Sequence, residues 1–309
     1  MASKFCIVSD GSCDLPEQTV RENDVAIVHF LVSFDGQEYK KEGVEIPLRD
    51  FYQRMVDAPK TYPKTAAPSP KDFYDVFQSA ARKGQDIICI CISSKLSSSV
   101  QSAQIAKQML QEEYPDIRIA VVDSLCATLM QSVYVLEVCR MRDAGYSFDD
   151  TLKIMEDLKK TARIFFTVGS FDYIQHGGRI GKMTSIAGTL LNIKPMITLQ
   201  DGEIHSSGVK RGRKKSLDGI VELLISYLRK SDCTPADCGI IIGYGYDYEE
   251  ACQLQKLTQK RLTEVFGGDA QTEIPVCQIG ATIGVHAGPT SIGYGVVQRA
   301  LPVENKKKS

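Results

Sequence analysis

The amino-acid sequence predicts an α/β protein made of two α/β domains with largely parallel sheets. Up to residue 123, apolar runs typical of strands alternate with helical patterns, and this alternation indicates βαβ units and a parallel sheet. Two long helical patterns follow, after which a second set of strands and helices begins. The chain has 309 residues, of which 43% are hydrophobic, and this is enough to form two packed domains.

The first predicted domain covers residues 1–160. Its strand at 86–93 is apolar along most of its length, as expected of a buried strand. Ser147, followed three residues later by Asp150, has the pattern of a capping box and marks the start of the last helix. The other predicted strands are 5–9, 26–34 and 117–123, and the other predicted helices are 16–22, 48–57, 70–83, 99–113 and 124–144.

The second predicted domain covers residues 161–309. It begins with the strand-like segment "RIFFTVGS" and continues into a hairpin, because Asp201-Gly202 favours a tight turn between two apolar runs. Two amphipathic helices are predicted at 214–230 and 248–266, on either side of the strand "GIIIGYG", and the strand "EIPVCQIG" follows the second helix.

Charge and hydropathy exclude several classes of function. A net charge of −1 gives no basic field of the kind that nucleic-acid binding requires, so no nucleic-acid partner is predicted. The apolar runs are too short to span a bilayer, although transient contact with a membrane surface is compatible with the sequence. The N-terminus leads directly into a strand without a signal-peptide pattern, which predicts a cytoplasmic location.

The cysteine and histidine patterns predict neither a metal site nor a cofactor. Of the ten cysteines, six lie in apolar strand or helix patterns, where they act as small hydrophobic side chains. No pair that lies close in the sequence has the CxxC spacing of a zinc site or a redox dithiol. The four histidines share no ligand spacing either. The six cysteines are Cys6, Cys89, Cys91, Cys126, Cys139 and Cys277.

A serine-rich segment, "CISSKLSSSVQSA", connects the strand at 86–93 to the helix at 99–113. Five of the seven residues at 93–99 are serine. The first turn of a helix presents unpaired N–H groups and a partial positive charge, and serine hydroxyls add further donors for an anion. A single serine here more often caps the helix, whereas the cluster as a whole favours an anion site.

The sequence matches neither of two common nucleotide-binding motifs, the phosphate-binding loop and the dinucleotide-binding GxGxxG. The segment "HGGRIGKM" superficially resembles a phosphate-binding loop, but His176 and Met183 stand where the motif needs Gly and Ser or Thr. No GxGxxG follows the first strand. His286 lies in the Gly-rich segment "GVHAGPTSIGYG", where two interpretations stay open: an imidazole that donates to an anion in a cleft, or a turn residue.

Taken together, several segments resemble the DegV family of bacterial fatty-acid-binding proteins. They are "IVSDGSCDLP", "PKTAAPSP", "ISSKLSSSVQSA", "FDYIQHGGRIGK" and the C-terminal "HAGPTSIGYG". Their order and spacing agree with the family over nearly the whole chain. The resemblance implies two α/β domains with a long-chain fatty acid between them, and a role as the lipid-presenting subunit of a fatty acid kinase.

The resemblance also implies which residues hold the fatty-acid carboxylate. Carried over by motif, they are Thr65 of "KTAAPSP", Ser94 of the serine-rich segment and His286, with Ser97 as a further candidate. The chain departs from the family pattern in two places. It has Ser98-Ser99 where Gly-Thr is usual, and "TAAPSP" where "TSQPSP" is usual.

The sequence contains no visible nucleophile, base and acid set, so a non-catalytic carrier that works with a separate fatty acid kinase is predicted. The alternative is a small-molecule phosphotransferase or hydrolase that uses the serine-rich segment as an oxyanion site. The basic stretch "VKRGRKK" is either a solvated face or a surface for the kinase or the transferred phosphate, with Arg211 as the candidate residue. Arg179 has a similar ambiguity between structural pairing and phosphate contact.

Overall fold

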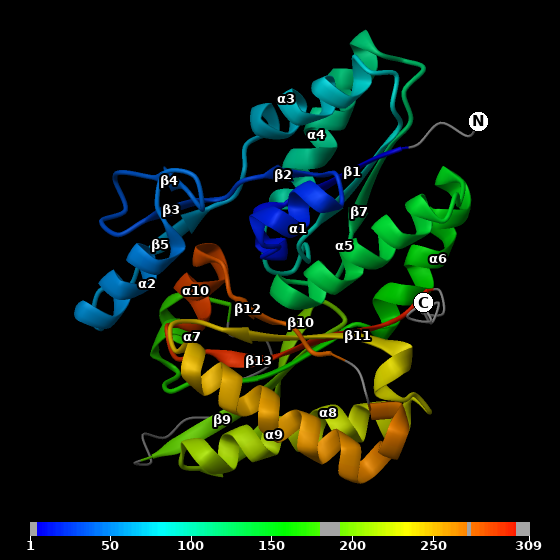
Figure 1. Cartoon of the computed structure of the whole chain (residues 1–309). Helices are drawn as coiled ribbons and strands as arrows, with labels where there is room; N and C mark the ends of the chain where they lie inside the picture. The colour runs from blue at the N-terminus through cyan, green and yellow to red at the C-terminus, as the bar shows by residue number, and fades with distance from the viewer. Residues whose placement is uncertain (1–4, 180–191, 271–272, 301–309) are drawn as a thin grey trace.

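A computed structural model describes residues 5–179, 192–270 and 273–300 (Figure 1). The helices are α1 (Glu17–Glu22), α2 (Leu48–Asp57), α3 (Pro70–Ala81), α4 (Ser99–Glu113), α5 (Thr128–Asp143), α6 (Phe148–Thr161), α7 (Asp172–His176), α8 (Arg213–Lys230), α9 (Tyr248–Phe266) and α10 (Ala281–Ala287), with 3₁₀ turns η1 (Gly11–Cys13), η2 (Pro235–Asp237) and η3 (Gly267–Ala270). The strands are β1 (Cys6–Asp10), β2 (Val25–Val28), β3 (Leu31–Ser33), β4 (Lys40–Lys41), β5 (Lys64–Ala66), β6 (Ile87–Cys91), β7 (Ile119–Asp123), β8 (Arg163–Thr167), β9 (Ile193–Gln200), β10 (Glu203–Arg211), β11 (Cys238–Tyr244), β12 (Val276–Gln278) and β13 (Ile292–Gln298).

The first half forms a parallel sheet with the strand order β2-β1-β6-β7, as predicted. Strand β6 is buried along its whole length because helices cover both of its faces. Cys89 and Cys91 point toward α3 and α4, whereas Ile88 and Ile90 point toward α5. The serine-rich segment follows the carboxyl end of β6 and contacts the second half of the chain, where the Ser93 hydroxyl donates to the Gly202 carbonyl.

The predicted strand at 26–34 is in fact two strands in different sheets. Strand β2 ends at Val28, which pairs with Asp10, the last residue of β1. Beyond that point β2 has no neighbour to pair with, so the chain turns and Leu31–Ser33 joins a small antiparallel sheet of order β4-β3-β5. This second sheet carries Thr65, which pairs with Val32.

The second half is α/β, but its sheet is mainly antiparallel, so the prediction of a largely parallel sheet was wrong for this half. The order is β10-β9-β8-β13-β11-β12, and only β11 and β12 are parallel. The predicted hairpin joins β9 and β10 through Asp201 and Gly202, whose φ angles of 52° and 78° match the tight turn. The Gly-rich segment "GVHAGPTSIGYG" contains the end of α10 and the start of β13, and β13 inserts between β8 and β11.

Helices α5 and α6 lie between the two large sheets (Figure 1). Val133 and Val138 of α5 belong to one apolar core that also contains Ile90 of β6 and Val297 of β13. The second sheet starts at β8, directly after α6, which is where the sequence places the change of domain. The division at residues 160 and 161 stays a prediction.

Several local features follow from the sequence signals. Ser147 caps α6 by accepting a hydrogen bond from the backbone N–H of Asp150. All ten cysteines lie within the described residues and are free thiols. Among the helices that the structure describes, none has the length and apolarity needed to cross a bilayer.

Candidate functional site

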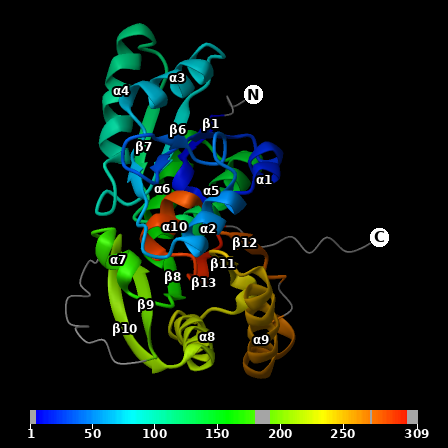
Figure 2. The ribbon, with the colours of Figure 1, turned by 90° about the vertical axis from the view of Figure 1, so that its left-hand side faces the viewer.

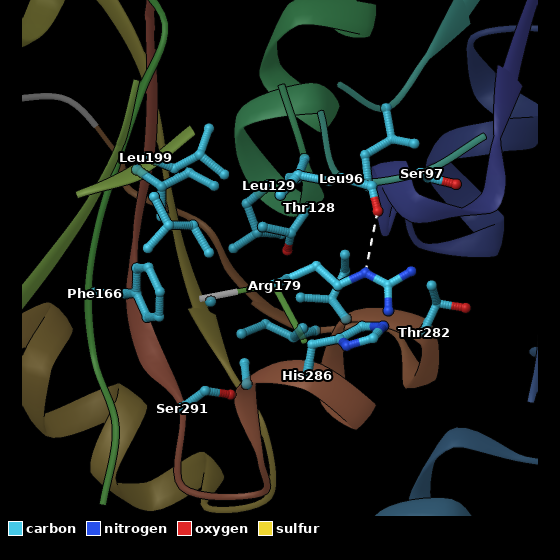
Figure 3. A pocket seen from close by; sticks show the side chains of 18 of the residues that line it. Leu96, Ser97, Thr128, Leu129, Phe166, Arg179, Leu199, Thr282, His286 and Ser291 are labelled. Atoms are coloured by element: carbon cyan, nitrogen blue, oxygen red, sulfur yellow. Dashed lines mark hydrogen bonds between the residues drawn. The ribbon is translucent and has the colours of Figure 1, made fainter. Parts of the chain in front are cut away.

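An apolar cavity of about 310 Å³ lies between the two halves of the chain, within the usual range for ligand pockets (Figure 3). Phe166 and Leu199 line one end of it, on the left in Figure 3, and Leu129 lines the cavity nearer its centre. Strand alternation explains this placement, because Phe166 of β8 faces the cavity while its neighbour Phe165 packs into the core on the other side of the sheet. Further apolar lining residues are Phe30, Ile92, Leu96, Ile164, Ile174, Ile204, Ile279 and Ile283.

Polar groups gather at the opposite end of the cavity. Thr65 comes from β5 and His286 from α10, and the Thr65 hydroxyl lies 3.2 Å from His286 Nε2 in a hydrogen bond. Ser97 and Arg179 also line this end. In Figure 3 the Arg179 side chain extends between Leu96 and His286, and its Nε donates to the Leu96 carbonyl at 3.2 Å. The structure therefore brings together four residues that the sequence placed far apart.

His286 is a neutral imidazole in this environment. Burial, and secondarily the positive charge of Arg179, lowers its pKa to about 4. Within the described residues its buried Nδ1 has no hydrogen-bond partner, and it faces Gly177, where a methyl group would come within 2.3 Å of it. Glycine at position 177 thus leaves room for the ring. At neutral pH, His286 Nε2 and the Thr65 hydroxyl can exchange donor and acceptor roles, and either group can turn to donate to an anion.

The serines of the serine-rich segment have different roles. Ser93 is buried and donates to the Gly202 carbonyl at 3.0 Å, which ties the segment to the β9–β10 turn. Ser94 is exposed, does not line the cavity, and donates its hydroxyl to Asp123 at 2.5 Å. Ser99 is buried and donates to Asp10 at 2.5 Å. Of the two predicted serines, Ser97 is the one that lines the cavity, and its hydroxyl accepts a hydrogen bond from the Ser99 backbone N–H at 3.3 Å.

A second, polar hollow adjoins the polar end of the cavity, and we call it the outer pocket. Leu96, Ser97, Ser98, Arg179 and Ile204 line both spaces, so the cavity opens toward it. Its remaining lining residues are Ser94, Lys95, Gly178, Gly202 and Glu203. Ser94 thus faces this pocket, whereas Arg211 lies exposed at the end of β10 and lines neither space. The part of the "HGGRIGK" segment from residue 180 onward lies outside the described residues.

Asp10, which the sequence did not single out, anchors the serine-rich segment through hydrogen bonds. It is fully buried at the end of β1, and burial raises its pKa, although several hydrogen bonds to the carboxylate oppose this shift. The Ser99 hydroxyl donates to it at 2.5 Å and the Ile92 backbone N–H at 2.9 Å, which fixes both ends of the serine-rich segment. The acidic residues of "SDGSCD" after the first strand were the available signal.

The polar end of the cavity is suited to binding an anion. The described residues at this end include the hydroxyls of Thr65, Ser97 and Thr282, a neutral imidazole and the Arg179 guanidinium, and they line a space that continues into apolar surface. A hydrolytic triad would need an acid on Nδ1 of His286, but that atom faces the backbone of Gly177. Within the described residues no group of three or more His, Cys, Asp or Glu side chains could hold a metal ion.

Known proteins resemble this chain over nearly its whole length. A family profile described as "Uncharacterised protein, DegV family" matches residues 4–299. A DegV domain-containing protein of Clostridium perfringens is 30% identical over 95% of this chain and 99% of its own length. A stearic-acid-binding protein of Eubacterium ventriosum has a solved structure that is 38% identical, with a TM-score of 0.88 over 96% of this chain and 98% of its own. A fatty-acid-binding DegV family protein of Thermus thermophilus is 28% identical, with a TM-score of 0.82 over 96% of this chain and 99% of its own. This chain belongs to the DegV family.

Proposed function

We propose that this protein binds a long-chain fatty acid, with the acyl chain in the apolar cavity and the carboxylate at its polar end. The observation that carries the proposal is the division of one cavity into an apolar part, around Leu129, Phe166 and Leu199, and a polar part, around Thr65, Ser97 and His286. Two similar solved structures are described as fatty-acid-binding proteins, which supports the same ligand class here.

The energetics favour a lipid over a small polar metabolite. Burial of an acyl chain of about sixteen carbons contributes on the order of 12 kcal/mol, at roughly 0.8 kcal/mol per methylene group. This exceeds the lower estimates of the cost of immobilising a ligand, so the head group has only to be oriented. Neutral hydroxyls and a neutral imidazole are sufficient for that task and leave the carboxylate open to a further reaction.

The second part of the proposal is that the protein presents the bound carboxylate to a separate fatty acid kinase, which phosphorylates it to an acyl-phosphate. The outer pocket supports this part, because it gives a path from solvent to the polar end of the cavity. Lys95 and Arg179 line this path and supply positive charge for a phosphoryl group. The protein itself acts as a carrier in the cytoplasm and supplies no catalytic group.

Native mass spectrometry of protein purified from bacteria tests the binding step. We expect a bound mass that corresponds to a long-chain fatty acid and that is lost after denaturation. A phosphotransferase or hydrolase would instead consume a small substrate without a retained lipid. Acyl-phosphate or hydrolysis product formed from ATP and fatty acid by this chain alone, without a kinase subunit, would contradict the carrier proposal.

Beyond its contact with the carboxylate, His286 is expected to contribute again after binding, when the carboxylate gains a phosphoryl group, and Arg211 is expected to act at that stage. His286→Ala should lower kinase-coupled turnover more than it weakens fatty-acid affinity, because a phosphoryl group gains more than a carboxylate from such donors. Arg211→Ala should have the same effect through a surface that faces the kinase, because Arg211 lines neither the cavity nor the outer pocket. Both quantities are measured for each variant at an unchanged melting temperature. Equal losses would assign the residue to carboxylate binding, and no change for Arg211→Ala would leave "VKRGRKK" as a solvated face.

A further inference from the structure

Two buried carboxyl groups, Asp14 and Glu42, meet at the start of α10. A methyl group on Gly280 would lie 2.2 Å from Asp14 Oδ1 and 2.3 Å from Glu42 Oε1, so these two oxygens are at most about 4.5 Å apart. Both side chains are less than a tenth exposed. They come from separate segments, since Asp14 follows η1 and Glu42 follows β4. Glycine at position 280 is what allows this approach.

The two carboxyl groups accept hydrogen bonds from the Thr128 hydroxyl and from the start of α10, including the Gly280 and Ala281 backbone N–H groups. Asp14 Oδ2 accepts from the Thr128 hydroxyl at 2.5 Å, and Glu42 Oε2 accepts from the Thr282 backbone N–H at 3.2 Å. Within the described residues, buried Asp14 Oδ1 has no hydrogen-bond partner of good geometry, although the nearby Gly280 backbone N–H lowers the pKa of Asp14 to some extent. Neither carboxyl group forms an ion pair within the part of the chain that the structure describes. Two buried carboxylates this close cannot both be charged without a counter-ion, so a proton between them is the expected partner.

Two threonines connect the carboxyl pair to the cavity, since Thr128 donates to Asp14 and the Thr282 backbone N–H donates to Glu42. Thr128 and Thr282 both line the cavity. Thr128 has a left-handed φ of 47°, and its bond to Asp14 helps hold that strained conformation. Glu42 holds the first turn of α10, and His286 lies on the last turn of the same seven-residue helix. Figure 2 shows α10 between the upper and lower halves of the molecule.

We propose that Asp14 and Glu42 share one proton, and that the protonated pair fixes the start of α10 and thereby positions His286 at the polar end of the cavity. The shared proton does not depend on the ligand, whereas the consequence for fatty-acid binding rests on the proposed function. Asp14 and Glu42 are positioning residues in this scheme, because they act on the ligand through α10.

The direction of the pH dependence follows from the electrostatics. Burial raises the pKa of Glu42 from 4.5 to about 7, and burial together with the Glu42 charge raises the pKa of Asp14. The folded protein thus holds this proton more tightly than the unfolded chain. The stabilisation is complete below about pH 4.5 and is lost as the pH rises to about 7. Other titratable groups that interact electrostatically with the pair are Asp10, Cys13, Tyr52 and Cys277, and His29 accepts or donates only at the Glu42 backbone.

Melting temperatures of the ligand-free protein between about pH 5 and pH 8 test the shared proton. In Glu42→Gln the side-chain amide replaces the protonated carboxyl group, so this variant should gain stability relative to the unmodified protein as the pH rises. The exposed Glu38→Gln is the matched control and should follow the unmodified protein at every pH. A difference between Glu42→Gln and the unmodified protein that does not change with pH would overturn the proposal.

A measurement on the unmodified protein covers the case in which Glu42→Gln does not fold. The infrared band of a protonated carboxyl group should disappear with a midpoint near pH 7, the value to which burial raises the pKa of Glu42. Its absence at about pH 6 would contradict a shared proton.

Affinity for stearic acid, used as the probe, tests the positioning step. The affinity of the unmodified protein should fall by about tenfold between about pH 6 and pH 8.5, which corresponds to a shift of about one pKa unit in the carboxyl pair when the ligand binds. The affinity of Glu42→Gln should stay constant over the same range. His286, whose pKa is about 4, does not titrate in this range. An unchanged affinity beside a pH-dependent melting temperature would overturn the positioning step alone. No binding of stearic acid at any pH would contradict the proposed function and leave the shared proton intact.

Discussion

Phe166→Glu is expected to weaken fatty-acid binding by at least about a hundredfold, equivalent to roughly 2.7 kcal/mol. Phe166 lines the apolar part of the cavity (Figure 3), where an acyl chain would replace any water around the new carboxylate. An uncompensated charge that loses its water in this way costs several kcal/mol, or the carboxyl group becomes protonated instead. The loss should therefore be larger at pH 8 than at about pH 5.

Phe166→Leu is the matched control for this experiment. It keeps the wall apolar and removes only part of the contact area, so affinity should stay within about tenfold of the unmodified protein. Fatty-acid affinity is measured for both variants, together with their melting temperatures. A folded Phe166→Glu protein that binds fatty acid as tightly as Phe166→Leu would show that the acyl chain does not occupy this cavity.

The local structure of the chain could be predicted from the sequence because local signals determine it. Ser147 and Asp150 cap α6, Asp201-Gly202 forms the hairpin turn, and the apolar run at 86–93 contains the buried strand β6. Each of these features depends on residues close together in the sequence. The order and direction of strands do not, which is why the antiparallel sheet of the second half and the split of the run at 26–34 were missed.

The candidate site could be predicted only as a set of residue types. Motif resemblance gave Thr65, Ser97 and His286, and the structure places all three at one end of the cavity. The same resemblance also gave Ser94, three residues before Ser97. The sequence pattern cannot tell which of the two serines lies at the cavity. They are joined by a turn, and the conformation of a turn is not given by the periodicity of a helix or strand. The proximity of Asp14 and Glu42 could not be predicted from the sequence, because the two residues belong to separate segments that meet at Gly280.

The polar end of the cavity and the carboxyl pair belong to one arrangement of elements. Strand β5 supplies Thr65 from the first half of the chain, whereas α10 supplies His286 from the second half. Their 3.2 Å contact therefore depends on how the two halves are held together. Asp14 and Glu42 make their contacts with α10 across the same junction. A ligand carboxylate that bridges Thr65, Ser97 and His286 would add to these contacts and couple binding to the stability of the junction.

Loss of the Thr65 and Ser97 hydroxyls together is expected to weaken fatty-acid binding by roughly ten- to a thousandfold, if each hydrogen bond to the carboxylate contributes about 1 to 2 kcal/mol. Thr65→Val with Ser97→Ala removes both donors and keeps the volume at position 65. Ser94→Ala is the control, because the Ser94 hydroxyl already donates to Asp123 and does not line the cavity. It should change the affinity by less than about twofold.

The comparison of Ser97 with Ser94 decides between the geometry and the motif resemblance. Dissociation constants are measured for Ser97→Ala, Ser94→Ala and the Thr65→Val, Ser97→Ala double variant, each at an unchanged melting temperature. If Ser94→Ala weakens binding as much as Ser97→Ala does, the Ser94 hydroxyl must leave Asp123 and reach the carboxylate when the ligand binds. If the double variant binds as tightly as the unmodified protein, the carboxylate does not lie between β5 and α10. Either result would move the head group into the outer pocket, where Ser94, Lys95 and Arg179 are the available donors.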